Sequence, residues 1–478
     1  MHYNPFRPLT RREMLRRIGA GFGTLGLAGL LDQTGQNAAG ADTVRGTQTS
    51  PVTPEPPHFA PQAKHVIQLF MPGGPSQVDT FDYKPDIRKF AGQRPKLVDR
   101  RTLRNIRNGL MPSPYGFKQY GECGKRVSDI FPHVAKQVDE ICFIHSMHTD
   151  IPEHFGAILM MNLGHLQPNR PSLGAWMVYG LGSENVNLPG FIAMSPRCQP
   201  AGAMANYGNS FLPAAYGGTY VNIQKIEPHS VMRDLASRDV SLRGQRRQAD
   251  LLNLLNRLDL DDQGRDDRLE SSIQMMELAF RMQMAVPEAF DLARETRATL
   301  DLYGNTEYAK GCLVARRLVE RGVRMVQLSL TIDGYTVPWD TGHEDIAGGH
   351  AKLARACDQG IAALLVDLKQ RGLLEETLVI WGGEFGRTPT SEGSKGRDHD
   401  HFGFTTWMAG GGVKPGFTYG ATDRFGFSAV ENRVHVHDLH ATILHLMGLD
   451  HEKLTYHYSG RDFRLTDVHG VVLDDIIA

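Results

Sequence analysis

Short apolar runs recur along the chain, and each ends in a segment rich in glycine, proline or polar residues. Such a run, bounded by turn-forming residues, is typical of a strand buried on both faces. The sequence predicts strands of this kind at residues 65–70, 141–144, 191–194, 323–330 and 377–381. Residues 172–180 and 357–371 carry apolar positions at three- and four-residue spacing, which predicts helices between the strands. This alternation favours an α/β fold with a mostly parallel sheet and helices on both faces.

One long segment departs from the alternation. Residues from about 240 to 303 are almost continuously helix-forming and rich in Leu, Met, Gln, Glu and Arg, which predicts a helical insertion. In open α/β sheets, ligands bind beyond the carboxyl ends of the strands. We therefore expect the chemistry of this protein in the loops that follow the strands.

The N-terminus has the build of an export signal. The paired Arg11 and Arg12 precede an uncharged apolar run at 18–31, which is shorter than the ~20 residues of a membrane-spanning helix. The paired arginines resemble a twin-arginine signal, whereas the alternative is a short amphipathic helix with arginines there by chance. We expect a signal peptide at 1–41, a flexible linker at 42–63 and a catalytic domain at 64–478. This predicts a periplasmic or secreted protein that uses the twin-arginine export machinery and has no stable membrane span.

Composition narrows the class of protein. The 478 residues are 41% hydrophobic and 22% charged, which excludes a disordered chain or a coiled coil. Basic residues number 52 against 53 acidic ones, so no general positive field for nucleic acid is expected. The five cysteines are scattered and form no disulfide framework. Histidine is abundant, with 20 residues that cluster along the chain.

Histidines and carboxylates gather just after two predicted strands. Asp340 and His343 follow the strand at 323–330, Glu384 follows the strand at 377–381, and His399 and His401 come shortly after. Neutral imidazole and carboxylate are the usual ligands of Zn²⁺, Mn²⁺ and similar ions, and two ions ~3.5–4 Å apart draw their ligands from several loops. Each fragment alone is equally compatible with a solvated loop, and Asp340 with a helix cap.

Three motifs resemble one family. They are Gly-Gly-Glu-Phe-Gly-Arg-Thr-Pro at 382–389, Met-Pro-Gly-Gly-Pro-Ser-Gln-Val-Asp-Thr-Phe-Asp at 71–82, and Trp-Asp-Thr at 339–341. They are similar to twin-arginine-exported proteins of unknown function that are related to sulfatases within the alkaline phosphatase superfamily. The resemblance covers roughly residues 60–478, and residues 438–448 look like the C-terminal helix of sulfatases. It implies an alkaline phosphatase/sulfatase-like α/β fold.

The resemblance also implies a ligand set. Asp340 and His343 resemble the pair of one metal site, which His399 or His401 would complete. Glu384 would bind a second metal, where Phe385 replaces a histidine of the superfamily. Asp79 would be a displaced ligand after the first strand. The ligands implied for one or two divalent ions (Zn²⁺, Mn²⁺, Ca²⁺ or Mg²⁺) are Asp79, Asp340, His343, Glu384, His399 and His401.

The nucleophile of the superfamily has no obvious counterpart. A Ser, Thr or Cys is expected at a helix N-terminus, where backbone N–H groups hold the oxyanion. Here His154 is nearest to that position, Thr149 lies earlier, and the Cys198 segment mimics the sulfatase signature only in part. We expect attack by metal-activated water or an unidentified nucleophile, with His154 as general acid/base. Arg387 would bind anionic oxygens or, equally, pair with a local carboxylate.

These observations lead to competing functions. The first is an exported metal-dependent hydrolase acting on an anionic sulfate or phosphate ester, for instance a sulfated glycan. The alternative is a catalytically inactive sulfatase-like binding protein that recognises sulfated polysaccharide. A metal-dependent isomerase or mutase on the same fold is a third. The hydrolase requires that acids and imidazoles far apart in sequence converge in one polar pocket.

Overall fold

The computed structural model describes most of the predicted catalytic domain. The described residues are 52–94, 108–227, 244, 246–247, 250–251, 267–332 and 334–478. The signal peptide expected at 1–41 lies outside them, as does most of the first half of the expected insertion. Within the described residues, the structure contains no helix that is both long and apolar enough to cross a membrane.

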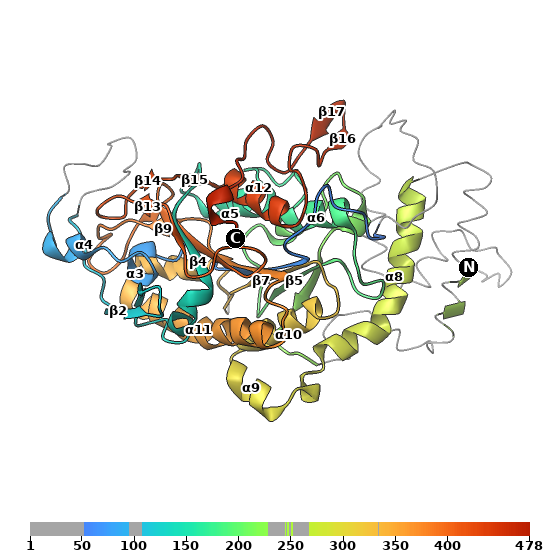
Figure 1. Cartoon of the computed structure of the whole chain (residues 1–478), viewed down its shortest axis with the longest axis horizontal. Helices are drawn as coiled ribbons and strands as arrows, with labels where there is room; N and C mark the ends of the chain where they lie inside the picture. The colour runs from blue at the N-terminus through green and yellow to red at the C-terminus, as the bar shows by residue number, and fades with distance from the viewer. Residues whose placement is uncertain are drawn as a thin grey trace, which may run out of the picture.

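A nine-stranded sheet forms the centre of the protein (Figure 1). Among its described strands, only β11 runs antiparallel to its neighbours, β4 and β8. The predicted mostly parallel α/β fold is therefore confirmed. In pairing order the strands are β12 (Thr418–Tyr419), β4 (Ile141–His148), β11 (Phe404–Ala409), β8 (Thr377–Gly382), β1 (His65–Phe70), β7 (Met325–Ser329), β5 (Phe191–Ser195) and β6 (Thr219–Asn222), with β15 (Val434–His435) beside β4.

The strands are continuous apolar runs because both faces of the sheet are covered. All six residues of β1 are buried, and β1 pairs in register with β7 on one side and β8 on the other. Its two polar side chains are satisfied: His65 bonds through Nδ1 to the carbonyl of Val323 (2.9 Å), and Gln68 donates to Asn162 (3.2 Å). Buried polar groups with partners cost little, so the central strand tolerates them.

Helices cover the two faces of the sheet in separate layers. In Figure 1, α5, α6 and α12 lie above the sheet, and α10 and α11 lie below it. The helices are α3 (Gln77–Thr80), α4 (Pro85–Lys89), α5 (His154–Leu163), α6 (Leu173–Leu181), α8 (Asp267–Phe290), α9 (Arg297–Tyr303), α10 (Glu307–Val319), α11 (Ile346–Gln370) and α12 (Val436–Leu446).

The lower layer is held by a close crossing of α10 and α11. A Cβ added at Gly360 of α11 would lie 2.6 Å from the Cα of Ala309 in α10, so only glycine permits this approach. Helix α11 begins at Ile346, well before the predicted start at 357. Its buried Leu353 and Cys357 continue the apolar face of its later turns, and this burial outweighs the low helix propensity of the glycines in its first turn.

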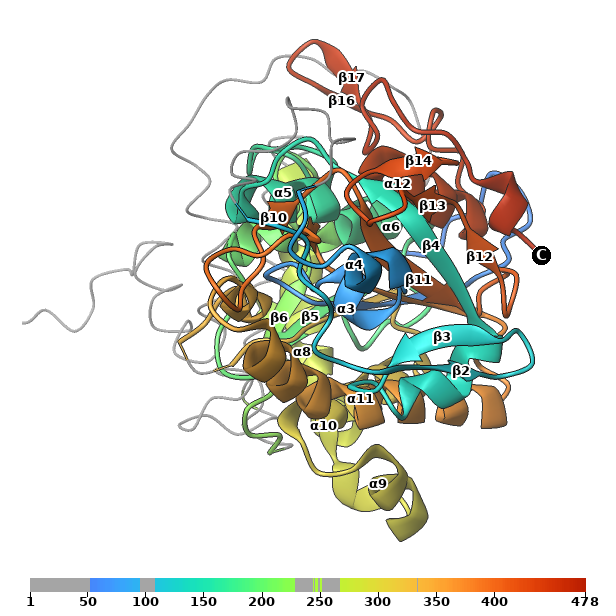
Figure 2. The same ribbon diagram turned by 90° about the vertical axis from the view of Figure 1, so that its left-hand side faces the viewer.

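The described part of the segment expected as an insertion is largely helical. Helix α8 is 24 residues long, and α9 projects from the end of the body opposite to the hairpin β16–β17 (Figure 2). Between α8 and α9, Glu295 forms an ion pair with Arg316 of α10 (2.7 Å), and Arg316 also pairs with Asp367 of α11 (2.9 Å). Arg316 is fully buried, so this network fixes the base of the insertion to the lower helix layer.

Residues 52–63 differ from the flexible tether expected there. The backbone of Glu55 donates to the carbonyl of Leu181, and that of Gln62 to the carbonyl of Leu446. A Cβ at Gly182 would lie 2.0 Å from the carbonyl oxygen of Thr53, so the segment runs directly against the body. Its proline- and threonine-rich composition reflects extended chain bound to the surface.

Short elements complete the fold. Two-stranded pairs connect and flank the main sheet, and 3₁₀ turns follow several strands. They are β2 (Phe117–Tyr120) with β3 (Lys125–Ser128), β9 (Gly386–Arg387) with β10 (His399–Asp400), β13 (Ala421–Thr422) with β14 (Ala429–Glu431), β16 (Tyr456–Tyr458) with β17 (Arg461–Phe463), and the turns η1 (Val134–Glu140), η2 (Ala203–Asn206), η3 (Ala214–Tyr216), η4 (Leu292–Arg294), η5 (Pro338–His343) and η6 (Asp474–Ile476).

Candidate metal centre

Loops from distant parts of the chain meet at the carboxyl edge of the parallel strands. Turn η5 follows β7 and carries Asp340 and His343, and β10 carries His399. Glu384 follows β8, and His154 is the first residue of α5. This is the edge at which α/β folds place their ligands.

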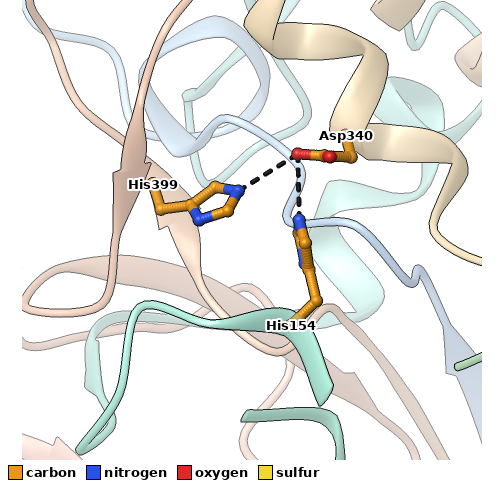
Figure 3. A group of neighbouring side chains, drawn as sticks. All are labelled: His154, Asp340 and His399. Carbon is orange, nitrogen blue, oxygen red and sulfur yellow. Dashed lines mark hydrogen bonds and ion pairs between the residues drawn. The ribbon is translucent and has the colours of Figure 1, made fainter. Parts of the chain in front are cut away.

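Asp340 is the point on which three imidazoles converge. The Nε2 atoms of His154, His399 and His343 lie 2.9, 3.1 and 3.3 Å from Asp340 Oδ1. Figure 3 shows His154 and His399 approaching Asp340 from different elements. The Nε2 atoms of His343 and His399 are themselves 2.8 Å apart. The group is open to solvent on one side, since the side chain of Asp340 is 33% exposed and that of His343 is 26% exposed.

The far side of each flanking imidazole is bound to an acceptor. His399 Nδ1 lies 2.7 Å from the carbonyl oxygen of Pro152, and His343 Nδ1 contacts the carboxylate of Glu392. A carbonyl or a carboxylate accepts hydrogen bonds, so Nδ1 is the protonated nitrogen of each neutral ring. The Nε2 lone pairs of His343 and His399 therefore face each other and the oxygen of Asp340.

Such an arrangement of acceptors fits a cation. Ligand atoms ~2.0–2.1 Å from a tetrahedral zinc ion lie roughly 3.3 Å from one another, close to the separations around Asp340. Metal-binding histidines commonly donate their other N–H to a carboxylate or carbonyl, which is the role of Glu392 and Pro152 here. Asp340, His343 and His399 have the donor chemistry and the placement to hold a divalent ion.

The electrostatics of the group centre on Asp340. Burial acts to raise its pKa, but the contacts of His154 and His399 and the charge and hydrogen bond of Arg387 hold the pKa well below its usual range. Burial also acts to lower the pKa of His154, yet its contacts with Asp340 and Glu384 raise that pKa to about 9. For His399, burial dominates and the pKa is lowered. Asp340 thus stays ionised and favours positive charge between its carboxylate and the imidazoles.

Glycine allows the loop after β1 to reach the site. Gly73 has φ +109°, and a Cβ there would lie 2.5 Å from the backbone nitrogen of Asp340. Its own N–H donates to both carboxylate oxygens of Glu384, at 2.9 and 3.1 Å. The loop therefore positions η5 and Glu384 together, and no side chain larger than hydrogen fits at Gly73.

Comparison with known proteins gives a family. Residues 63–477 match the model described as "Protein of unknown function (DUF1501)". The chain belongs to this family. No curated protein matches the sequence. The DUF1501 match spans the whole sheet and every residue of the site, so the described architecture is that of the family domain in this chain.

Several solved structures share part of the architecture. A lipoteichoic acid synthase from Listeria monocytogenes has 9% identity and a TM-score of 0.36, over 87% of this chain and 78% of that one. A sulfatase from Pseudoalteromonas sp. has 13% identity and a TM-score of 0.35, over 82% and 68%. Alkaline phosphatase from the Antarctic bacterium TAB5 has 10% identity and a TM-score of 0.28, over 75% and 94%. At these values the likenesses assign neither an activity nor a ligand to this chain.

The DUF1501 site brings together some of the residues expected from the sequence and not others. Asp340, His343 and His399 converge, and Glu384 joins them through His154. Asp79 instead forms a fully buried ion pair with Arg397, with Nε to Oδ2 at 2.6 Å and Nη2 to Oδ1 at 3.1 Å. This pair engages both oxygens of Asp79, so the structure gives it the surroundings of a structural group rather than of a ligand.

The two remaining predicted residues also have other surroundings. The ring of His401 packs against Phe402, with ring centroids 3.7 Å apart, and its backbone carbonyl accepts from the N–H of Thr149. Arg387 is fully buried beneath Asp340 and donates to its Oδ1 (2.7 Å) and to the carbonyls of Gly73 and Gly74. Of the two roles expected for Arg387, the geometry matches pairing with a local carboxylate and not direct contact with a substrate anion.

Sequence reasoning missed two acidic residues of the site. Asp398 forms a second group with His343 and His399, in which one ligand atom of each lies within 4.8 Å of the others. Glu392 contacts His343 from a turn between β9 and β10. Asp398 directly precedes His399 in the sequence, and this position could have indicated it as a residue of the site. Glu392 carries no such signal, because only the hairpin β9–β10 brings it near.

Proposed function

We propose that this DUF1501 protein is an exported, metal-dependent hydrolase of phosphate or sulfate esters. The observation that supports it is the convergence of imidazole Nε2 atoms on Asp340 Oδ1 at a partly exposed edge of the sheet. A buried, closed ligand set is typical of structural metal sites, whereas catalytic sites leave a position open. A side chain of Asp340 that is one-third exposed favours the catalytic class.

Each residue of the site would then have a separate role. A divalent ion bound by Asp340, His343 and His399 would polarise an ester oxygen and lower the pKa of bound water to about 7. Arg387 holds Asp340 from below and fixes the direction of its carboxylate. His154 lies beside Asp340 with Glu384 behind its ring, so its Nε2 would serve either to exchange a proton with the substrate or to bind the ion.

A hydrolysis assay tests the proposal. The purified protein would be loaded with Zn²⁺, Mn²⁺, Mg²⁺ or Ca²⁺ and given aryl phosphate mono- and diesters and aryl sulfates, with and without chelator. We expect turnover that chelator abolishes and that Asp340→Asn lowers by at least 100-fold. Glu344→Gln, at an exposed position nearby, removes the same charge and should leave turnover unchanged. A folded, metal-loaded protein without turnover on any of these esters would refute the proposal.

One observation favours the non-catalytic alternative. His154 occupies the start of α5, where the resemblance would place a hydroxyl or thiol nucleophile, and the other candidates lie elsewhere. Cys198 donates to the carbonyls of Ile332 and Tyr335, and Thr149 is buried, with its N–H donating to the carbonyl of His401. A protein that binds sulfated polysaccharide without cleaving it would give the inactive outcome of the assay together with measurable binding of such a glycan.

Export is part of the proposal. The paired arginines and the apolar run that follows support transport by the twin-arginine pathway to the periplasm or beyond. Replacing Arg11 and Arg12 together by lysine should leave the full-length precursor in the cytoplasmic fraction. Equal recovery of the variant and the original protein outside the cytoplasm would contradict this route.

A further inference from the structure

His154 presents both ring nitrogens to carboxylates. Its Nδ1 lies 2.6 Å from Glu384 Oε1, and its Nε2 lies 2.9 Å from Asp340 Oδ1. Glu384 is fully buried beside Nδ1, and a carboxylate oxygen accepts hydrogen bonds, so Nδ1 of His154 carries a proton whether the ring is neutral or charged. Its Nε2 then faces a carboxylate oxygen, an arrangement that needs positive charge between the two atoms, supplied by a proton on Nε2 or by a metal ion that replaces this proton.

The position of His154 relative to the other imidazoles matches that of a ligand. Its ring lies 4.3 Å from that of His399, centroid to centroid, and its Nε2 is as close to Asp340 as that of His399. Each of the three histidines has an acceptor at Nδ1 and directs Nε2 to Asp340. We propose that this site binds a single ion through His154, His343, His399 and Asp340, with Glu384 as a positioning residue for His154.

The surroundings of Glu384 argue against a second ion beside this residue. Both of its oxygens accept from the N–H of Gly73, and Oε1 also accepts from His154. The next residue, Phe385, is buried and packs its ring against His154 and His399, with centroids 4.9 and 4.6 Å apart. The loop at Gly74 closes over the same ring, since a Cβ there would lie 2.8 Å from it. The place that a second ion would need beside Glu384 is filled by protein.

The donor set also selects the class of ion. Three imidazoles and one carboxylate suit a borderline first-row ion such as Zn²⁺, whereas Ca²⁺ and Mg²⁺ prefer all-oxygen surroundings. The exposed side of Asp340 leaves access for an oxygen of an ester or of water as a further ligand. This inference extends the proposed function from an unspecified one- or two-ion site to a one-ion site with histidine at the first position of α5.

Metal analysis of the whole exported chain tests the inference. The metal-free protein would be titrated with Zn²⁺, and zinc per folded chain and affinity would be measured for the original protein and for His154→Ala, Glu384→Gln and His457→Ala. His457 is a surface histidine paired with Asp462, so its variant is the matched control. We expect one ion per chain, at least 100-fold weaker binding for His154→Ala, and 10- to 100-fold weaker binding for Glu384→Gln with an unchanged count. The His457→Ala variant should bind like the original.

X-ray absorption of the zinc-loaded original protein adds a readout that needs no variant. We expect three imidazoles around zinc. Two ions per chain, two imidazoles around zinc, or unchanged affinity in folded His154→Ala would overturn the inference. The ester assay on the same samples separates the two claims: one ion without turnover would refute only the hydrolase, and metal-dependent turnover with two ions would refute only the single-ion site.

Discussion

The ion pair between Asp79 and Arg397 gives a direct test of which carboxylates stabilise the fold and which bind metal. Both side chains are fully buried, and Arg397 also donates to the carbonyl of Met111 (2.8 Å). Removing one partner of a buried pair leaves the other charge uncompensated and costs about 3–5 kcal/mol. We therefore expect Asp79→Asn to lower the free energy of unfolding by about 3–5 kcal/mol at neutral pH while the folded variant still binds zinc.

The pH dependence of this effect has a definite sign. Burial acts to raise the pKa of Asp79, but the charge of Arg397 and the hydrogen bonds from Arg397 and Ser76 lower it below the usual value. The contribution of the ionised pair is therefore present above the unfolded pKa of ~3.9 and is lost as the pH falls through the lower folded pKa. The difference between the original protein and Asp79→Asn should shrink in that acidic window.

Urea unfolding followed by circular dichroism, with zinc content measured on the same samples, checks this prediction. Asp86→Asn provides the matched control, because Asp86 pairs with Arg424 at the surface, where such pairs contribute about 0–1 kcal/mol. An Asp79→Asn protein that unfolds at the same urea concentration as the original but has lost its zinc would refute the reasoning. Asp79 would then be a ligand, as the resemblance implied.

Three further perturbations follow from the structure. Gly73→Ala forces a Cβ to 2.5 Å from the backbone of Asp340 and should weaken zinc binding by more than 10-fold in a titration, whereas Gly92→Ala, with open space around its Cβ, should leave it unchanged. Arg387→Lys loses the forked contacts to Asp340 and to the loop after β1, and should lower the free energy of unfolding in urea by about 3 kcal/mol. An unchanged urea midpoint would contradict the role of Arg387 in holding Asp340. Burial lowers the pKa of His440 to about 3. The contribution of neutral His440 to the free energy of unfolding is therefore fully present above pH ~6.5 and falls by about 2 kcal/mol by pH 5. His440→Gln should lose less stability than the original between pH 7.5 and 5, and equal losses would contradict that assignment.

Much of the fold was predictable because apolar runs report burial directly. β1 spans the predicted residues 65–70, and the strands at 141, 191, 323 and 377 were each located to within a few residues. Strand β11 was not predicted, since its Thr405 and Thr406 interrupt the apolar pattern. Its antiparallel direction depends on pairing with β4 and β8, which are distant in sequence.

The candidate site was predictable in its residue types and less so in its contacts. Asp340, His343, Glu384 and His399 follow strands whose carboxyl ends share one edge, so their proximity follows from topology. Asp79 is only a few residues beyond β1, but the helical turn α3 directs it toward Arg397 instead. No sequence pattern predicts a contact between residues 79 and 397, because this contact depends on how two loops pack.

The central claim is that the imidazoles of His154, His343 and His399 and the carboxylate of Asp340 bind one ion together. Anomalous diffraction at the zinc edge from crystals of the zinc-loaded protein tests it most directly. We predict one anomalous peak per chain, about 2.0–2.1 Å from the three Nε2 atoms and from an oxygen of Asp340. A peak pair beside Glu384, or a single peak away from these four side chains, would contradict the account.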